Sequence, residues 1–246
     1  MTAILGPQPR TVVWFSCGAA SAVAAWLTLR ETPDSVLVYA DTGSEHPDNT
    51  RFMADAESWL GKKIVVIRSE KYRDTWQVFK ERRYLVGPKG ALCTAELKKI
   101  PRFGFQRPDD IQVFGYVAGE ESRAKRFREQ NFDVDMRTPL IEKGLTKSDC
   151  LDIILRNRIE LPAMYRLGYR NNNCIGCVKG GAGYWNKIRV DFPDVFQRMS
   201  DQEQELGATV LRKDGKPLPL AELEPGTGRY EAEEIGCSLL CADVLA

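Results

Sequence analysis

Short apolar runs alternate with longer amphipathic stretches up to about residue 70. The runs at 11–15, 35–40 and 63–68 are rich in β-branched and aromatic residues, which predicts three strands, the first of them buried. Between them, residues 22–30 have helical composition, and a second helix is predicted over 47–60 because that stretch begins at a proline and stops at a glycine. Since strands joined through helices make right-handed crossovers, this order predicts a parallel α/β sheet.

The pattern is less regular beyond the third strand. Three further stretches are periodic enough to assign: a strand at 111–118, an amphipathic helix at 146–157 and a helical stretch at 185–206. The composition changes near residue 161, where asparagine, glycine and cysteine become frequent. We therefore expect an α/β domain over residues 1–160 and a loop-rich, Cys-bearing C-terminal extension over 161–246, packed on the same domain.

Composition narrows the class of protein. Hydrophobic residues make up 43% of the 246 residues, so a disordered chain is not expected. The chain has 35 Lys+Arg and 34 Asp+Glu, a net charge of +1, so a grossly polybasic chain is not expected either. No apolar run approaches the ~20 residues that span a bilayer, so we expect a cytoplasmic protein with no membrane partner. His46 is the only histidine, which excludes a zinc site built from several histidines. Seven cysteines in a reducing compartment indicate metal binding or redox chemistry.

Small residues follow the first two predicted strands, at the edge where a parallel sheet binds its ligands. Backbone N–H groups in such a turn, together with the start of the next helix, form a favourable site for phosphate. The two loops are expected to face each other across one crevice; an ordinary strand-to-helix turn and a helix-capping loop are the alternatives. The candidate nucleotide-binding residues are Ser16, Cys17, Gly18, Ala19, Ser21, Asp41, Thr42 and Gly43, with the side chain of Cys17 expected to pack inside.

The two loops resemble motifs of a known superfamily. Ser16-x-Gly18-x-x-Ser21 followed by Asp41-Thr42-Gly43 is similar to the pattern of the sulfonucleotide reductases, which act on phosphoadenylyl sulfate (PAPS) or adenylyl sulfate (APS), and of the N-type ATP pyrophosphatases. The resemblance covers about residues 12–241 and includes, in the shared order, the segments 93–101, 121–126, 138–149, 161–177 and 228–241.

This resemblance implies a Rossmann-like adenine nucleotide alpha-hydrolase fold that binds PAPS, APS or ATP. It singles out Lys98 and Arg126 among the basic residues of 92–137, because both fall in matched motifs and suit contact with phosphate in catalysis. Cys17 and Ala20 replace a glycine and an aspartate of the pyrophosphatase loop, which favours the reductase branch. Against that branch, no histidine follows the cysteines of the C-terminal tail.

Five of the seven cysteines form two close pairs, Cys174/Cys177 and Cys237/Cys241, and a single residue, Cys93. Thiolates at such spacings suit zinc, an iron–sulfur cluster or a dithiol redox couple. The resemblance implies a 4Fe–4S cluster held by Cys93, Cys174 and Cys177, and we expect Cys241 as the fourth ligand and Cys237 as the catalytic thiol. The alternative is a structural zinc bound by Cys174, Cys177, Cys237 and Cys241. Cys150, on an amphipathic helix, is expected in the core.

Three functions stay open at this point. The first is a sulfonucleotide reductase-like enzyme that works with a thioredoxin-like reductant. The second is an ATP pyrophosphatase-type enzyme that adenylates and thiolates a nucleic acid. The third is a nucleotide-binding protein that catalyses no reaction and is stabilised by a bound zinc ion. In each case we expect a homo-oligomer.

Overall fold

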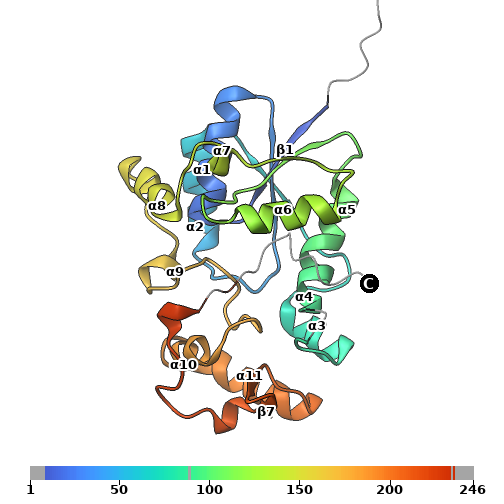
Figure 1. The fold of residues 1–246 in the computed structure, drawn as a ribbon, viewed down its shortest axis with the longest axis vertical. Coiled ribbons are helices and arrows are strands. Elements are labelled where there is room, and N and C mark those ends of the chain that lie inside the picture. Colours follow the sequence, from blue (N-terminus) through green and yellow to red (C-terminus); the bar gives the residue numbers. More distant parts are fainter. Residues whose placement is uncertain (1–8, 88–89, 234, 236–246) are drawn as a thin grey trace, which may run out of the picture. The chain divides into compact units, whose positions relative to one another are not determined.

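The computed structural model describes residues 9–87, 90–233 and 235 (Figure 1). The chain forms two compact units. The first, here the sheet unit, comprises Met1–Ala40, Pro47–Ile67 and Gly104–Arg166; the second, here the cysteine unit, comprises Asp41–His46, Arg68–Phe103 and Leu167–Ala246. The units draw on both sides of residue 160, so the division at that residue stays a prediction.

The sheet unit is built on five parallel strands in the order β3-β2-β1-β4-β5. This confirms the predicted α/β class and all three N-terminal strands. The predicted fourth strand is shorter than expected, because the chain leaves the sheet before Gly115, where a Cβ would lie only 2.9 Å from the Cα of Ser21. The strands are β1 (Thr11–Phe15), β2 (Val36–Ala40), β3 (Ile64–Ile67), β4 (Ile111–Val113) and β5 (Asp135–Arg137).

Several helices share one core with the sheet. Val13 and Phe15 of β1 and Leu37 of β2 are fully buried there, together with Phe52 and Ile154 from two of the helices. α1 is buried over most of its surface, which explains its nearly all-apolar sequence. The helices of this unit are α1 (Ala19–Glu31), α2 (Asn49–Leu60), α6 (Glu121–Gln130), α7 (Pro139–Glu142), α8 (Lys147–Arg156) and α9 (Ala163–Arg166).

The cysteine unit is mainly helical. The predicted helical stretch at 185–206 is two helices, because Pro193 begins the second one and the residue before a proline is pushed out of the helical region. A hairpin follows, with Asp214 and Gly215 both at positive φ in its turn. The elements are α3 (Thr75–Arg82), α4 (Leu92–Thr94), a π-helix (Ala95–Lys99), α5 (Ile100–Phe105, which ends in the sheet unit), α10 (Ala182–Asp191), α11 (Pro193–Leu206), β6 (Leu211–Lys213), β7 (Lys216–Leu218) and the 3-10 turns Leu220–Glu222 and Tyr230–Ala232.

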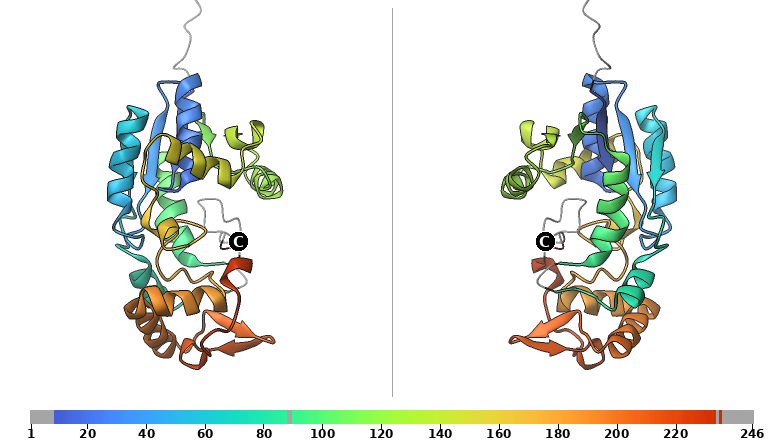
Figure 2. Two further views of the ribbon diagram at one scale, coloured as in Figure 1. Left: turned by 90° about the vertical axis from the view of Figure 1, so that its left-hand side faces the viewer. Right: turned by 90° about the vertical axis from the view of Figure 1, so that its right-hand side faces the viewer.

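The hairpin of β6 and β7 follows α11 along the chain (Figure 2), and one buried carboxylate ties the hairpin to this helix. Glu203 accepts hydrogen bonds from the backbone N–H of Val210, 2.7 Å away, and of Leu220, 2.6 Å away. Burial raises the pKa of this carboxyl group, while the two backbone donors work in the opposite direction. In the described part of the chain, no helix is both long and apolar enough to cross a membrane.

Candidate functional site

The turn after β1 lies at the switch point of the sheet. From β1 the chain proceeds outward to β2 and β3, and it later returns to the other side of β1 as β4 and β5. Ligands of open parallel sheets bind outside the carboxyl ends of the strands at such a point. The close approach of Gly115 to Ser21 places the segment after β4 directly against the turn after β1.

Ser21 holds this turn together from inside. Its Oγ accepts hydrogen bonds from the Ser16 backbone N–H at 3.0 Å and from the Ser16 hydroxyl at 3.1 Å, and it donates to the Gly18 carbonyl oxygen at 2.9 Å. Ser21 is buried, whereas Ser16 is exposed. The geometry therefore gives Ser21 a role in shaping the turn, and leaves Ser16 as the hydroxyl at the surface.

Cys17 makes the turn sharp. Its φ is +54°, in the left-handed region that costs a residue other than glycine roughly 1–2 kcal/mol. Its side chain is fully buried, with Sγ 3.9 Å from the carbonyl oxygen of Asn49. This agrees with the expectation that Cys17 packs inside, and it allows α1 to begin at Ala19, four residues after β1 ends at Phe15.

The N-terminus of α1 has the electrostatic character of an anion site. Its N-cap residue, Gly18, has no side chain to cap it, and its first turn contains no acidic residue. The thirteen-residue helix therefore directs the positive end of its dipole at this turn without compensation from an aspartate or glutamate. The Ala19 N–H donates to the Tyr165 hydroxyl at 3.4 Å, and a Cβ at Gly18 would lie 3.2 Å from that hydroxyl.

Tyr165 is not among the site residues that the sequence predicts. It lies between the matched Leu161-Pro162 and Gly168-Tyr169 segments, and no local pattern brings it to residue 19. The ammonium of Lys147 lies 5.8 Å from the centroid of its ring. The Tyr165 hydroxyl thus lies at the turn, and a cation lies near the ring that carries it. Both groups suit an anionic ligand.

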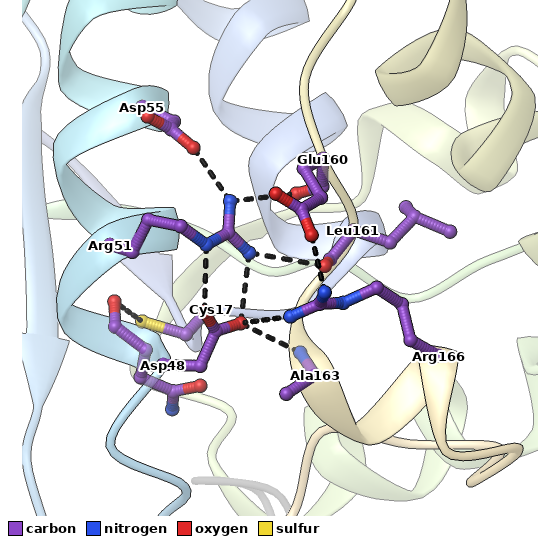
Figure 3. A network of polar contacts seen from close by, with 9 residues as sticks. Cys17, Asp48, Arg51, Asp55, Glu160, Leu161, Ala163 and Arg166 are labelled. Carbon is purple, nitrogen blue, oxygen red and sulfur yellow. Dashed lines mark hydrogen bonds and ion pairs between the residues drawn. The ribbon is translucent and has the colours of Figure 1, made fainter.

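An ion-pair network anchors the segment that carries Tyr165 (Figure 3). Arg51 binds Asp48 through two hydrogen bonds, of 2.7 and 2.8 Å, and donates to the carbonyl oxygens of Glu160 and Leu161 at 3.1 Å. Asp48 also accepts from the Ala163 N–H at 2.7 Å. A second guanidinium, that of Arg166, pairs with both acidic side chains, Asp48 and Glu160. α2 and the 160–166 segment are thereby held together.

The network predicts a pH-dependent stability. Arg51, as hydrogen-bond donor, lowers the pKa of Asp48 from 3.8 to about 2. A lowered carboxyl pKa stabilises the fold above the unfolded-state value and loses that effect as the pH falls toward the folded-state value. We expect Asp48→Asn to lower the free energy of unfolding by about 2 kcal/mol at pH 7 and by about half of that at pH 3, measured by urea denaturation.

Asp55→Asn is the matched control, because Asp55 pairs with the same Arg51 at 2.7 Å but its side chain is 42% exposed. This variant should cost no more than about 0.5 kcal/mol. Equal losses from both substitutions would contradict the role given to Asp48.

Arg126, also in the sheet unit, lies on an exposed part of α6. Its neighbours on this helix have partners: Arg123 pairs with Glu120, and Arg128 donates to the Thr138 hydroxyl at 3.3 Å. Arg126 itself forms no ion pair with any residue that the structure describes. Its predicted contact with phosphate stays a prediction.

The loop Asp41–His46 belongs to the cysteine unit and is internally bonded. Asp41 accepts from the Gly43 N–H at 2.8 Å, and its other oxygen lies 2.6 Å from a guanidinium nitrogen of Arg68. Gly43 has a φ of +65°, and a Cβ there would lie 2.1 Å from the carbonyl oxygen of Arg73, so this position requires glycine. The shared crevice of this loop with the turn after β1 stays a prediction, since the two belong to different units.

Lys98 lies in the π-helix that follows α4. Its side chain is mostly buried, and its Nζ is 4.0 Å from an oxygen of Glu45, which is also nearly buried. The other carboxylate oxygen of Glu45 accepts from the backbone N–H of Thr42 at 3.2 Å. The cation predicted for catalysis is therefore linked through one carboxylate to the Asp41–His46 loop.

The C-x-x-C turn is organised by a tyrosine. The hydroxyl of Tyr184 accepts from the N–H groups of Gly176 at 3.0 Å and Cys177 at 2.9 Å, and it donates to the Cys174 carbonyl oxygen at 3.3 Å. Gly176 takes a φ of +76°, and both cysteine side chains are buried. Complete burial raises the pKa of Tyr184 well above its usual value. Tyr184 therefore acts as a neutral donor and acceptor.

The cysteines predicted to bind a metal fit that role in part. Two buried thiols on a C-x-x-C turn are the chemistry that zinc and iron–sulfur clusters accept. Cys93 is half-buried and packs against a small apolar cluster of Tyr72, Val78 and Leu97 in the same unit. Among residues 9–87, 90–233 and 235, no group of three or more His, Cys, Asp or Glu side chains is arranged to hold a metal ion. Cys237 and Cys241 lie outside the described residues.

The segment before these two cysteines is firmly bonded. Asn171 and Asn173 each donate a side-chain N–H to the Ile235 carbonyl oxygen at 3.2 Å. Glu233 accepts from the Gly181 and Gly183 N–H groups at 2.9 and 2.7 Å, at the start of α10. Two residues of the asparagine run at 171–173 therefore have a structural role.

Comparison with known proteins gives distant similarities. No family model matches the chain. An uncharacterized protein of Methanocaldococcus jannaschii is 24% identical over 205 residues, which is 79% of this chain and 41% of that protein, so the chain spans about two fifths of the length of this curated relative.

Two solved structures are similar to the chain. One is phosphoadenylyl-sulfate (PAPS) reductase from Candida auris in a phosphate complex, with 13% identity, a TM-score of 0.49 and coverage of 70% of this chain and 84% of that one. The other is U34-tRNA thiolase NcsA from Methanococcus maripaludis with its 4Fe–4S cluster, with 15% identity, a TM-score of 0.44 and coverage of 100% and 86%.

Proposed function

We propose that this protein is an enzyme that binds an adenine nucleotide at the turn 16–21 and carries out thiol-dependent sulfur chemistry of the sulfonucleotide reductase kind. The observation that supports it most is the N-terminus of α1 at the switch point of the sheet, which begins after a glycine and has no acidic residue in its first turn. A phosphate or sulfate group of the nucleotide would accept hydrogen bonds from the N–H groups there. The Tyr165 hydroxyl lies at this position, and the Lys147 ammonium lies 5.8 Å from the centroid of the Tyr165 ring.

The reductase reaction needs a nucleophilic thiol and a good leaving group. The Cys237 thiolate attacks the sulfur of PAPS or APS, the bond between that sulfur and the phosphate oxygen breaks, and the nucleoside phosphate leaves with the electron pair. Backbone N–H groups of the turn, with Arg126 of the same unit, stabilise the charge on the leaving phosphate. One thiol of a thioredoxin-like partner then attacks the Cys237 sulfur and releases sulfite, and the partner's second thiol resolves the mixed disulfide, so that the partner leaves oxidised to a disulfide.

Departures from the reductase pattern favour a second candidate, an ATP-dependent thiolase acting on nucleic acid. Thr94, which is buried, stands where the reductases have a second adjacent cysteine, and no histidine follows Cys237. The matched cysteines are then Cys93, Cys174 and Cys177, which would supply the thiolate ligands of a cluster. In either reaction the bound cluster would supply the sulfur or redox chemistry.

Product analysis separates the two reactions. The full chain, purified without oxygen, is incubated with PAPS or APS and a reduced thioredoxin, and separately with ATP and tRNA. Sulfite release that Cys237→Ser abolishes and Cys150→Ala preserves supports the reductase. Pyrophosphate release that depends on tRNA supports the thiolase. A chain that binds none of these nucleotides would refute both.

A further inference from the structure

A hydroxyl of the Asp-Thr-Gly loop bonds directly to a sulfur of the C-x-x-C turn. Thr42 Oγ1 lies 3.1 Å from the Sγ of Cys174, although the two residues are 132 positions apart in the sequence. Thr42 is 1% exposed and Cys174 is 6% exposed, so water does not compete for this contact. Both residues belong to the cysteine unit.

Further hydrogen bonds fix both sides of this contact. The Ile175 N–H donates to the Ser44 carbonyl oxygen at 3.0 Å, which joins the two loops through the backbone. Glu45 accepts from the Thr42 N–H on one side, and the Tyr184 hydroxyl bonds three backbone groups of the cysteine turn on the other. The threonine hydroxyl is therefore held at the sulfur by its surroundings.

The direction of this bond depends on the state of the sulfur. When Cys174 is a thiol, either group can donate. When Cys174 is a thiolate, bound to a metal or free, only Thr42 can donate, and a bond from a neutral donor to an anion is stronger than one between neutral groups. The contact is thus strengthened in the thiolate form alone.

We infer that Thr42 is a positioning residue for Cys174: its hydroxyl, 3.1 Å from the sulfur and buried between two joined loops, fixes where that sulfur lies and can donate to it when it binds a metal. This rests on the part of the proposed function in which Cys174 acts as a thiolate. Partners of this kind, which bond a metal ligand from outside, typically change metal affinity by 10–100-fold. The loop that the sequence assigns to the nucleotide would therefore also set the strength of the thiolate site.

The test is cobalt binding by the full chain, reduced and kept without oxygen, followed by the thiolate-to-cobalt absorption band. Thr42→Val keeps the branched shape and removes the hydroxyl, and it should weaken Co²⁺ binding by about 10-fold or more and alter the band. Thr42→Ser restores the hydroxyl and should bind within about 2-fold of the wild type, a span equal to about 0.4 kcal/mol.

Thr75→Val is the matched control. Thr75 is buried in the same unit, and its hydroxyl bonds the Ser44 hydroxyl at 2.9 Å. Its partner is therefore an oxygen, whereas the partner of Thr42 is a sulfur. It should leave Co²⁺ affinity and the band unchanged, even if it lowers the melting temperature as much as Thr42→Val does. The inference is overturned if Thr42→Val binds Co²⁺ like the wild type, if Thr75→Val loses as much affinity, or if the wild type shows no thiolate-to-cobalt band. Because no nucleotide is present, absence of turnover with PAPS, APS or ATP would count against the proposed function only.

Discussion

Valine in place of Gly18 is expected to weaken adenine-nucleotide binding by about 100-fold or more while the sheet unit keeps its fold. A Cβ at this position would lie 3.2 Å from the Tyr165 hydroxyl and 3.6 Å from the Ser16 Oγ, and the two methyl groups of valine extend further into the mouth of the turn. A phosphate would lose one or two charge-assisted hydrogen bonds, each worth about 1.5–3 kcal/mol, which corresponds to the stated loss. Titration calorimetry with PAPS, APS and ATP measures it.

The fold should survive because Gly18 has an ordinary φ of −103°. Gly104→Val provides the control, since a Cβ at this exposed helical glycine of the same unit meets nothing within 4 Å. Gly104→Val should bind nucleotide like the wild type. An unchanged affinity in Gly18→Val would remove the turn after β1 from the proposed site.

The predicted elements that the structure confirms are those with a strong apolar signal. β1 and β2 are buried runs of β-branched and aromatic residues, and α8 has the amphipathic period and a capping box at Thr146. β5 was missed because its three residues are Asp, Met and Arg, which pair with β4 without an apolar run of their own. α6 was missed because its ten residues are mostly charged and only Ala124 and Phe127 are buried.

The site shows the same limit of local sequence patterns. The turn at 16–21 could be located because small residues directly follow a strand, and Cys17 was correctly expected to pack inside. The inward role of Ser21 depends on side-chain rotamers, which a motif does not encode. Tyr165 reaches Ala19 only because the Asp48–Arg51 network anchors its segment, and this contact joins residues 146 positions apart.

The cysteine unit illustrates why a motif predicts residue types better than roles. Asp41, Thr42 and Gly43 were selected together as a nucleotide loop. In the structure Asp41 pairs with Arg68, Thr42 bonds a sulfur, and Gly43 allows close approach to the Arg73 carbonyl oxygen. Each of these partners lies more than 20 residues away in the chain, so spacing within the motif carried no information about them.

Removal of either thiol of the C-x-x-C turn is expected to abolish metal binding and to destabilise the cysteine unit. Cys174→Ala also leaves the Thr42 hydroxyl without its sulfur partner, whereas Cys177→Ala leaves the backbone bonds to Tyr184 in place. Since metal binding contributes folding free energy at such sites, both variants should lose their bound iron or zinc and melt at lower temperature than the metal-loaded wild type. Iron, sulfide and zinc analysis after purification without oxygen measures the loss.

Cys150→Ala separates this effect from the general cost of removing a buried cysteine. Cys150 is fully buried in the core of the sheet unit, and burial raises the pKa of its thiol to about 12, so it stays a neutral packing group. Its replacement should cost about 1 kcal/mol of stability, an ordinary value for a core substitution, and retain the full metal content. If all three variants keep their full metal content, neither cysteine of the C-x-x-C turn is a metal ligand. If only Cys174→Ala loses metal, Cys174 is a ligand and Cys177 is not.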